Sequence, residues 1–281
     1  ELWGVDLNSL ESGAVQLCDI WSGSGSGQPS SSSGQVAIIG GSAYFSAKDQ
    51  SYGSELWSYS PETALCNRHT DIRQGSSGSN PGFTSGGIHN FGTVAGFSAN
   101  DGTTGNELWL YSPENETAWL TEDLSVGSIS SYPGQHSGFS LSDEGIVYFT
   151  ASSTGFGYEP HTLNLENFSI SLLSDVRAGS KSSDAGRNSG YVFLDRNLYF
   201  DANDGTGSDL WVVKNATNNS AVSWTVHPQL PFGLEISSVD GTISGTPTQS
   251  SPMTTYIVTA TNSTGSSMTV SYTHLRAHET P

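Results

Sequence analysis

The sequence predicts an all-β protein: β-propeller-like repeats of four-stranded blades, followed by a partial Ig-like β-sandwich. Three observations predict this class. Short runs of Val, Ile, Tyr, Phe and Trp are separated by clusters of Gly, Ser, Asn and Asp, as in proteins built from short strands and turns. Long helical periodicity is absent from the sequence. The tripeptide Glu-Leu-Trp recurs at a nearly constant interval.

The repeats start near residues 1, 55, 107, 159 and 209, and the tripeptide is intact in the first three copies. Degenerate copies begin at Glu159 and Asp209. A fixed period of about 52 residues is typical of a solenoid, a propeller or a bead-like array. A parallel β-helix is the main rival of the propeller, but its coils are usually shorter and more regular.

Each period has the same internal order. After the tripeptide, a strand-like run ends in an aspartate followed by an aliphatic residue, then comes a Gly/Ser loop, and then two further strand-like runs. These aspartates are Asp19, Asp71, Asp123 and Asp175. Each period therefore holds about four short strands, which is the size of one propeller blade.

A single blade cannot bury both of its faces, so the repeat predicts blades that stack on their neighbours. The recurring rings of Trp57, Trp109 and Trp211 suit the core between blades. The Asp-Gly pairs that precede the tripeptide suit tight turns.

On these residues the chain resembles the ELWxxDGT-repeat family of large microbial surface proteins. A unit of that family reads ELW-x-x-D-G-T, a strand ending in D-I, a Gly/Ser/Pro loop, and F-x-A-x-D-G-x-x-G. The resemblance covers residues 1–214. It is clearest at Ala99–Trp109 and Ala202–Trp211, and looser at Tyr44–Trp57. It implies a β-propeller-like surface protein.

The chain departs from the family pattern after the tripeptide, where Ser-Pro-Glu stands at Ser60–Glu62 and Ser112–Glu114. The third unit has lost both the turn aspartate and the tryptophan. The resemblance therefore does not imply a function that needs one acidic ligand from every repeat.

The phase of the repeat breaks after Lys214, and residues 215–222 form a polar linker. Residues 223–272 resemble the PIG module, an Ig-like and cadherin-like β-sandwich of bacterial and archaeal surface proteins. The matching segments are Leu230-Pro231, Gly233-Leu234, Gly241–Pro247 and Thr254–Ser266.

Residues 273–281 resemble a translated sequencing adapter and are interpreted as a non-native tail, which suggests a metagenomic source. Because the chain begins at Glu1 without Met, we interpret it as a fragment of a longer protein.

The net charge of the chain disfavours two kinds of binding partner. Nine Lys and Arg stand against 27 Asp and Glu, which gives a net charge of −18. A surface so acidic disfavours nucleic acid and anionic membranes. No apolar run is long enough to span a bilayer, so we expect no membrane insertion of this chain.

Two cysteines, Cys18 and Cys66, match no metal-ligand spacing. Two readings stay open from the sequence: a bridge between neighbouring structural units, or two unpaired thiols packed as small apolar residues.

No catalytic motif is evident, and no two of the five histidines before the tail lie at metal-ligand spacing. We therefore predict no catalytic residues and no cofactor.

The acidic turns near the tripeptide are weak candidates for Ca²⁺ ligands. The alternative is a hairpin turn with a carboxylate that caps backbone N–H groups, which we favour. The candidate ligands are Asp49, Glu55, Asp101, Glu107, Asp204 and Asp209.

These observations favour a non-enzymatic, extracellular or cell-surface protein of binding or adhesion, whose propeller loops meet a glycan or protein ligand. The first alternative is a glycan-active hydrolase or lyase with its site on the central face of the propeller. The second is a structural spacer. An enzyme of the first kind needs several convergent carboxylates at the axis, and no pair stands out from the repeat background.

Overall fold

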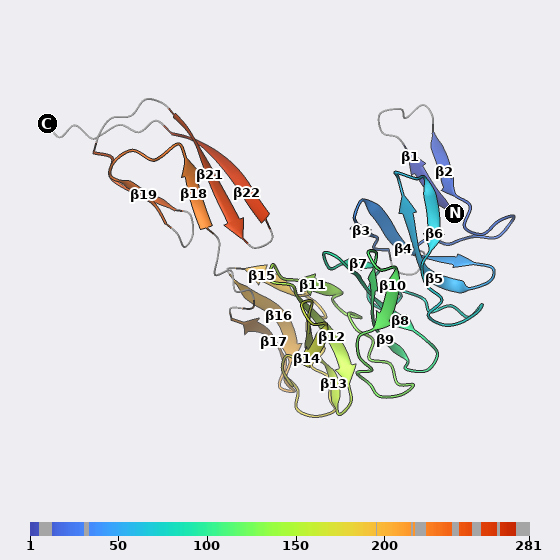
Figure 1. Cartoon of the computed structure of the whole chain (residues 1–281). Coiled ribbons are helices and arrows are strands. Elements are labelled where there is room, and N and C mark those ends of the chain that lie inside the picture. Colours follow the sequence, from blue (N-terminus) through green and yellow to red (C-terminus); the bar gives the residue numbers. More distant parts are fainter. Residues whose placement is uncertain are drawn as a thin grey trace. The chain divides into compact units, whose positions relative to one another are not determined.

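The computed structural model describes residues 1–5, 13–30, 34–194, 196–214, 216, 223–237, 242–248, 254–262 and 265–273 (Figure 1). The chain divides into two compact units, Glu1–Lys214 and Asn215–Pro281, and each is described by itself. Every regular element among the described residues is a β-strand. The predicted all-β class is confirmed. Among these residues, none forms a helix with the length and hydrophobicity that a membrane crossing requires.

The first unit holds three complete four-stranded antiparallel sheets, in which the strands lie in chain order. The first sheet has β3 (Ala37–Ile39), β4 (Ser42–Asp49), β5 (Gly53–Ser60) and β6 (Leu65–Arg68). The second has β7 (His89–Asn90), β8 (Ala95–Asn100), β9 (Asn106–Ser112) and β10 (Thr117–Leu120). The third has β11 (Phe139–Leu141), β12 (Ile146–Ser153), β13 (Phe156–Asn164) and β14 (Ser169–Leu172). The predicted four-stranded, blade-like repeat is confirmed.

Two incomplete sheets flank these three. The N-terminal sheet pairs β1 (Leu2–Val5) with β2 (Ala14–Cys18). The C-terminal sheet orders β15 (Val192–Leu194), β16 (Asn197–Asn203) and β17 (Ser208–Val213). The Glu-Leu-Trp segment, or its degenerate form, lies on the third strand of each blade, where the first sheet has β5. Figure 1 shows the sheets of this unit following one another in chain order.

The cores of the first unit lie between sheets rather than within them. One buried cluster joins the N-terminal sheet to the next through Cys18, Ile20, Phe45 and Ala47. A second packs Leu56 and other residues of the first complete sheet against Phe97, Tyr111 and their neighbours in the second. A third joins the second and third complete sheets. Each internal sheet thus buries both faces only because a neighbour lies on each side.

The second unit contains a three-stranded sheet and a separate hairpin. The sheet orders β18 (Ser223–His227), β21 (Thr254–Asn262) and β22 (Gly265–Thr273), and the hairpin joins β19 (Leu234–Ile236) to β20 (Ile243–Gly245). At residues 255–259 of β21 the side chains alternate between more and less buried, and Tyr256 and Val258 are buried.

The glycines of the PIG-like motif meet in this hairpin. A Cβ on Gly233 would lie 2.1 Å from the carbonyl oxygen of Thr246, and the φ of Gly233 is +93°. Only glycine suits such a close approach in a left-handed conformation. Of the predicted linker, only Ala216 is described. Of the predicted tail, Thr273 lies in β22, and the remaining residues, like Gly241, lie outside the described residues.

Candidate functional site

Long loops connect the last strand of each blade to the first strand of the next. They comprise residues 69–88, 121–138 and 173–191, and residues 19–36 form a fourth, described at 19–30 and 34–36. We call these four segments the interblade loops. Near its start each loop contains the aspartate and aliphatic residue of the repeat, and it also carries the Gly/Ser-rich stretch.

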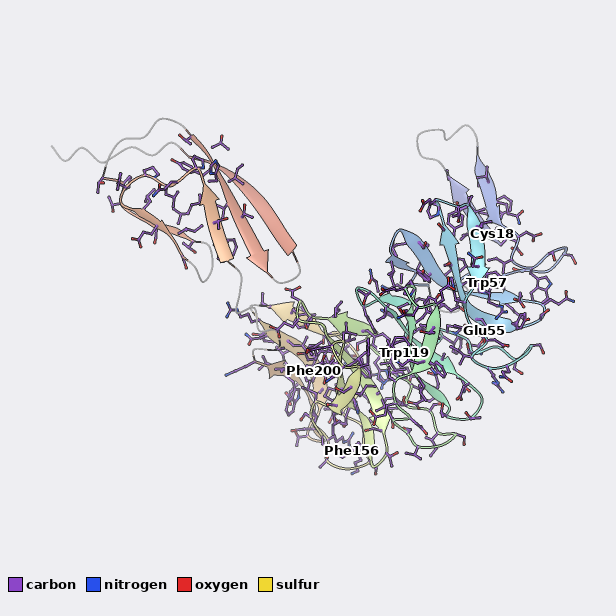
Figure 2. The ribbon with its side chains drawn as sticks, in the orientation of Figure 1. Cys18, Glu55, Trp57, Trp119, Phe156 and Phe200 are labelled. Atoms are coloured by element: carbon purple, nitrogen blue, oxygen red, sulfur yellow. A yellow bond between two sulfur atoms is a disulfide. The ribbon has the colours of Figure 1, made fainter. Side chains whose placement is uncertain are left out.

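A buried glutamate fastens the loop at 69–88. Glu55 on β5 is fully buried, and its Oε1 accepts a hydrogen bond from the backbone N–H of Ser79 at 2.9 Å. Its Oε2 accepts from the hydroxyls of Thr70 and Ser79, at 2.7 and 2.9 Å, and from the N–H of Ile72 at 3.2 Å. Figure 2 shows Glu55 on the same part of the chain as Trp57. The glutamate of the tripeptide therefore holds a loop that begins more than a dozen residues later.

The same arrangement recurs with a constant spacing. Glu107 accepts from the N–H groups of Leu124 and Ser131, which lie 17 and 24 residues downstream. Glu159 accepts from those of Val176 and Ser183, at the same two separations. The degenerate third repeat therefore keeps this interaction although it lacks the tryptophan.

The two ends of the repeat region differ from this pattern. At the start, Glu1 accepts from Ile20, Trp21 and Gly27. In the last blade Asp209 occupies the equivalent position and is exposed. Among the described residues, no interblade loop follows β17 that Asp209 could hold.

Burial raises the pKa values of these carboxyl groups. The pKa of Glu107 rises to about 7, because loss of solvation outweighs the hydrogen bonds from Ser131 and Leu124, and the nearby Asp123 adds to the rise. Burial also raises the pKa values of Glu55 and Glu159. A perturbed carboxyl group can mark a catalytic site. Here the oxygens are fully buried and occupied by loop donors, which favours a structural role.

The Asp-aliphatic residues cap the start of the same loops. Asp71, Asp123 and Asp175 each accept the N–H of a glycine four residues later, at 3.1, 2.9 and 3.1 Å. Hydrogen bonds of this kind satisfy backbone donors in a turn.

The aspartates considered as Ca²⁺ ligands lie in hairpin turns and accept hydrogen bonds from them. Asp49 accepts from the N–H groups of Ser51 and Tyr52 and lies 3.6 Å from Arg68. Asp204 accepts from both the N–H and the hydroxyl of Thr206.

Asp101 makes the densest of these turns. It accepts from the N–H groups of Thr103 and Thr104, each at 2.7 Å, and from both hydroxyls. The structure does not join Asp101 to Glu107, which binds an interblade loop instead. Within the described part of the chain, no three His, Cys, Asp or Glu side chains form a group that could hold a metal ion.

The repeated tryptophans lie at the borders of the interblade clusters. Trp57 and Trp109 are half-buried, pack against the clusters on one side of their sheets, and have indole N–H groups without a partner. Trp211 donates to the carbonyl of Ala202 at 3.1 Å. The fully buried residues of these strands include the neighbouring leucines, Leu56 and Leu108.

The sequence left two possibilities open for the cysteines, and the structure contains the first of them, a bridge between neighbouring structural units. Cys18 on β2 and Cys66 on β6 form a disulfide, with Cα atoms 6.0 Å apart. It joins the outer strands of two neighbouring sheets, near Trp57 (Figure 2).

A surface cavity opens where two interblade loops meet the hairpin between β4 and β5. Its volume is about 350 Å³, near the lower end for ligand pockets. Its lining includes Phe83, which is 59% exposed, and Lys48, whose ammonium lies 5.3 Å from the ring centre of Trp21. The remaining lining residues are small or polar: Gln28, Gly53, Ser54, Ser76, Ser77 and Asn80.

Hydrogen bonds connect this cavity to the next loop. Thr84, beside Phe83, donates to the side chain of Asn106 at 2.9 Å, and the carbonyl of Asn106 accepts from the N–H of Tyr132 at 3.1 Å. Tyr132 is 37% exposed. The loops at 69–88 and 121–138 are therefore neighbours.

Polar and aromatic contacts continue to the third loop. The ring of His136 lies 5.4 Å from that of Tyr158, and its Nε2 lies 3.5 Å from Asp184, which also pairs with Arg187. We call the surface formed by the cavity, Tyr132 and this group the loop face.

The other histidines of the first unit lie in separate places. His69 bonds to Ser58 and to Tyr111. His89 bonds to the carbonyl of Ser85, and His161 to the carbonyl of Glu159. Burial lowers the pKa of each of these three histidines.

Comparison with known proteins supports the Ig-like part. Residues 197–275 match a family model described as a "Putative Ig domain". This confirms an Ig-like module in this part of the chain, although the match begins at β16 rather than at the predicted residue 223. The resemblance of residues 1–214 to ELWxxDGT repeats stays a prediction.

One solved structure, TolB from Acinetobacter baumannii, is similar over 65% of this chain, with 15% sequence identity and a TM-score of 0.40. The similar region spans 40% of the TolB chain. A likeness at this level carries no argument about function. No curated protein sequence matches this chain.

Proposed function

We propose that this chain is a non-enzymatic binding protein of the cell exterior, in which the loop face receives a glycan or protein ligand and the Ig-like module acts as a stalk. The Ig-like module and the propeller-like repeats are compatible with a binding or structural protein. One observation supports a binding role for the loops. Buried carboxylates hold the interblade loops by hydrogen bonds, while aromatic and polar side chains of the same loops remain exposed to solvent. Loops fixed in this way lose little conformational entropy when a ligand binds.

The chemistry of the cavity favours a polar ligand with an apolar face. Phe83 offers an exposed ring, and Gln28, Asn80 and the serines offer both donors and acceptors. Pockets that combine an aromatic wall with a few placed polar groups are typical of small-ligand recognition. A sugar residue of a glycan, or a polar side chain of a protein, has this combination.

The location outside the cell is supported by the disulfide and by the charge. Disulfides persist mainly in oxidising compartments, and Cys18 and Cys66 are joined. A net charge of −18 keeps a protein soluble and disfavours anionic surfaces.

The test is a glycan array and a cell-binding assay on the full chain, followed by calorimetry with each ligand found. We expect Phe83→Ala and Asn80→Ala to weaken binding by about tenfold or more, which corresponds to about 1.4 kcal/mol. Leu65→Ala is the matched control, because Leu65 is also exposed (57%) but lies on an outer strand away from the cavity.

Two results would contradict the proposal. If neither assay finds a ligand, a structural spacer is the better account. If a panel of polysaccharides is cleaved and the products are released, the chain is a hydrolase or lyase.

A further inference from the structure

The cavity beside the hairpin between β4 and β5 contains a lysine without a carboxylate partner. Lys48 is half-buried, and it is the one charged side chain among the described residues that line the cavity. Within the described part of the chain, no carboxylate forms an ion pair with it. This is unexpected in a chain with 27 Asp and Glu against nine Lys and Arg. A half-buried cation that the protein leaves unpaired is accessible to an anion from outside.

The two carboxylates near Lys48 are engaged elsewhere. Asp49, the next residue on β4, accepts hydrogen bonds from its own turn and lies 3.6 Å from Arg68. Glu1 accepts from the N–H of Gly27 and from two further N–H groups of the same loop. The carbonyl of Gly27 in turn accepts from the backbone N–H of Lys48 at 2.7 Å. Glu1 therefore helps to place the lysine without neutralising its charge.

The hairpin fold does not require a lysine at this position. In the strand pairing, Lys48 corresponds to Asn100, Ser152 and Asn203 of the other blades, which are all neutral. The Lys48 ammonium lies 5.3 Å from the ring centre of Trp21, a contact that is favourable for a cation and keeps its charge. The positive charge is therefore particular to this cavity.

The backbone around the cavity is closely packed. A Cβ on Gly53 would lie 2.6 Å from the backbone nitrogen of Gly78, so the hairpin and the interblade loop are in direct contact. The carbonyl of Ser54 accepts from the N–H groups of Ser79 and Asn80, at 2.9 and 3.1 Å. A cavity held in this way is already formed before a ligand binds, which lowers the entropic cost of binding.

The other lining groups are complementary to a sugar. The ring of Phe83 is 59% exposed, and the C–H face of a sugar ring can pack on it. The side-chain amides of Gln28 and Asn80 have no partner among the described residues. Amides, like the hydroxyl groups of a sugar, both donate and accept hydrogen bonds.

We propose that the cavity binds the terminal sugar of a glycan through a carboxylate on that sugar, with the Lys48 ammonium as the partner of the carboxylate. This inference rests on the proposed function, because it names the class of ligand for the same cavity. One carboxylate at the end of a glycan is favoured over a polyanion, because a chain of net charge −18 repels a polymer that is charged at every residue.

The experiment is an array on the full chain that presents acidic and neutral sugars in matched pairs. One member of each pair is an oligosaccharide that ends in glucuronate, galacturonate or mannuronate. Its counterpart ends in glucose, galactose or mannose, so the two differ only in the carboxylate. In at least one pair the acidic member should bind about tenfold or more tightly, as measured by calorimetry. Added salt should reduce this ratio, because it screens the ion pair.

Substitution of Lys48 tests which group provides the preference. Lys48→Gln should reduce the ratio to about twofold or less and leave binding of the neutral member unchanged, whereas Lys48→Arg should retain the ratio. Lys181→Gln is the matched control, because it removes the same charge from an exposed position outside the cavity. Phe83→Ala should weaken both members of a pair, since the ring packs on a part that they share. Thermal unfolding establishes that each variant is folded.

The outcomes separate this inference from the proposed function. If both members of every pair bind equally well, or if Lys48→Gln and Lys181→Gln lower the preference equally, the inference is wrong and the proposed function stands. If the chain binds a tetraglutamate peptide and none of the sugars, the ligand is a protein, and the inference is again wrong while the proposed function stands. If neither a glycan nor a protein binds, both are wrong.

Discussion

Glu107 on β9 accepts two hydrogen bonds from Ser131, one from its backbone N–H at 2.9 Å and one from its hydroxyl at 2.5 Å. The two residues are 24 positions apart and both fully buried. The N–H of Ser131 also lies within hydrogen-bond distance of the carbonyl of Asn106, and Ser152 on the following sheet donates to the carbonyl of Ser131. One serine thus connects two blades, and the glutamate of the tripeptide holds it in place.

Removing such a carboxylate should destabilise the repeat unit. Glu55→Ala removes the acceptor of the Thr70 and Ser79 hydroxyls and of the N–H of Ile72, and opens a cavity. The N–H of Ser79 keeps the carbonyl of Ser54 as an acceptor. Leaving buried donors unsatisfied costs about 1–3 kcal/mol each, so we expect a loss of about 2–4 kcal/mol in the free energy of unfolding. Urea unfolding followed by tryptophan fluorescence measures it.

Glu62→Ala is the matched control for this substitution. Glu62 is an exposed glutamate in the turn after β5, and its removal should change the free energy of unfolding by less than about 0.5 kcal/mol. Equal effects of the two substitutions would show that Glu55 does not stabilise the fold by holding the interblade loop at 69–88.

The raised pKa of Glu107 predicts a pH dependence of stability. Its pKa is about 7 in the folded chain and 4.5 in the reference state. The folded chain therefore binds the proton more tightly. The resulting stabilisation is fully present below about pH 4.5 and is lost as the pH rises through about 7. At about 1.4 kcal/mol for each pKa unit, the change is on the order of 3 kcal/mol.

The comparison of wild type with Glu107→Gln isolates this group. Buried His69, His89 and His161 have lowered pKa values and act in the opposite direction, but they are common to both proteins and cancel. The free energy of unfolding of wild type minus that of Glu107→Gln should fall between about pH 5 and pH 8. A difference that stays constant or rises would contradict the assignment.

The sequence predicts the blades well, but it does not predict the hydrogen bonds that attach the interblade loops to the buried glutamates. The reason is physical. Strands and turns are local, so the alternation of apolar and polar residues and the fixed period predict four strands per blade. The partners of Glu55 lie 15 to 24 residues downstream and meet it only when the loop folds back. One signal was available: Ser79, Ser131 and Ser183 recur at the same distance from their glutamates.

The burial of the tryptophans and the pairing of the cysteines also depend on contacts between sheets, which the local sequence does not specify. Trp57 packs against the cluster between the N-terminal sheet and the next, and Leu56, which faces the opposite side of the strand, is the more deeply buried of the two. The pairing of Cys18 with Cys66 depends on the stacking of two sheets. Spacing along the chain could not decide it.

The disulfide should stabilise mainly the N-terminal sheet. It closes a loop between residues 48 positions apart and joins a two-stranded sheet to its neighbour. Loss of a bridge of this kind typically costs about 2–4 kcal/mol. Cys18→Ser combined with Cys66→Ser should therefore speed hydrogen exchange in β1 and β2 more than in β8 and β9. Uniform acceleration across the first unit would contradict a local role.

The turn of Asp101 predicts how the protein responds to Ca²⁺. Its oxygens already accept hydrogen bonds from Thr103 and Thr104. Adding Ca²⁺ or EDTA should leave the melting temperature unchanged, because a ligand that does not bind cannot shift the equilibrium. Asp101→Ala should cost about 1 kcal/mol through the lost turn bonds. A rise in melting temperature with Ca²⁺ that Asp101→Ala abolishes would instead establish a calcium site.

Two glycines that lie two residues before the tripeptide position provide the sharpest test of the loop contact. At Gly157 on β13, an added Cβ would lie 2.4 Å from the carbonyl carbon of Lys181, in the interblade loop that Glu159 holds. At Gly207, the equivalent position before β17, an added Cβ would meet nothing within 4 Å, and no interblade loop lies against it among the described residues. Neither residue has a positive φ, so backbone strain does not separate them.

Gly157→Ala must displace the loop backbone and should cost about 2 kcal/mol or more, as overpacking typically does. Gly207→Ala should be neutral within about 0.5 kcal/mol. Thermal unfolding of the two variants beside wild type measures both. The comparison keeps the substitution and the place in the repeat constant and changes only the presence of the loop. A similar loss in both variants would mean that the glycine serves the hairpin rather than the close approach of the interblade loop.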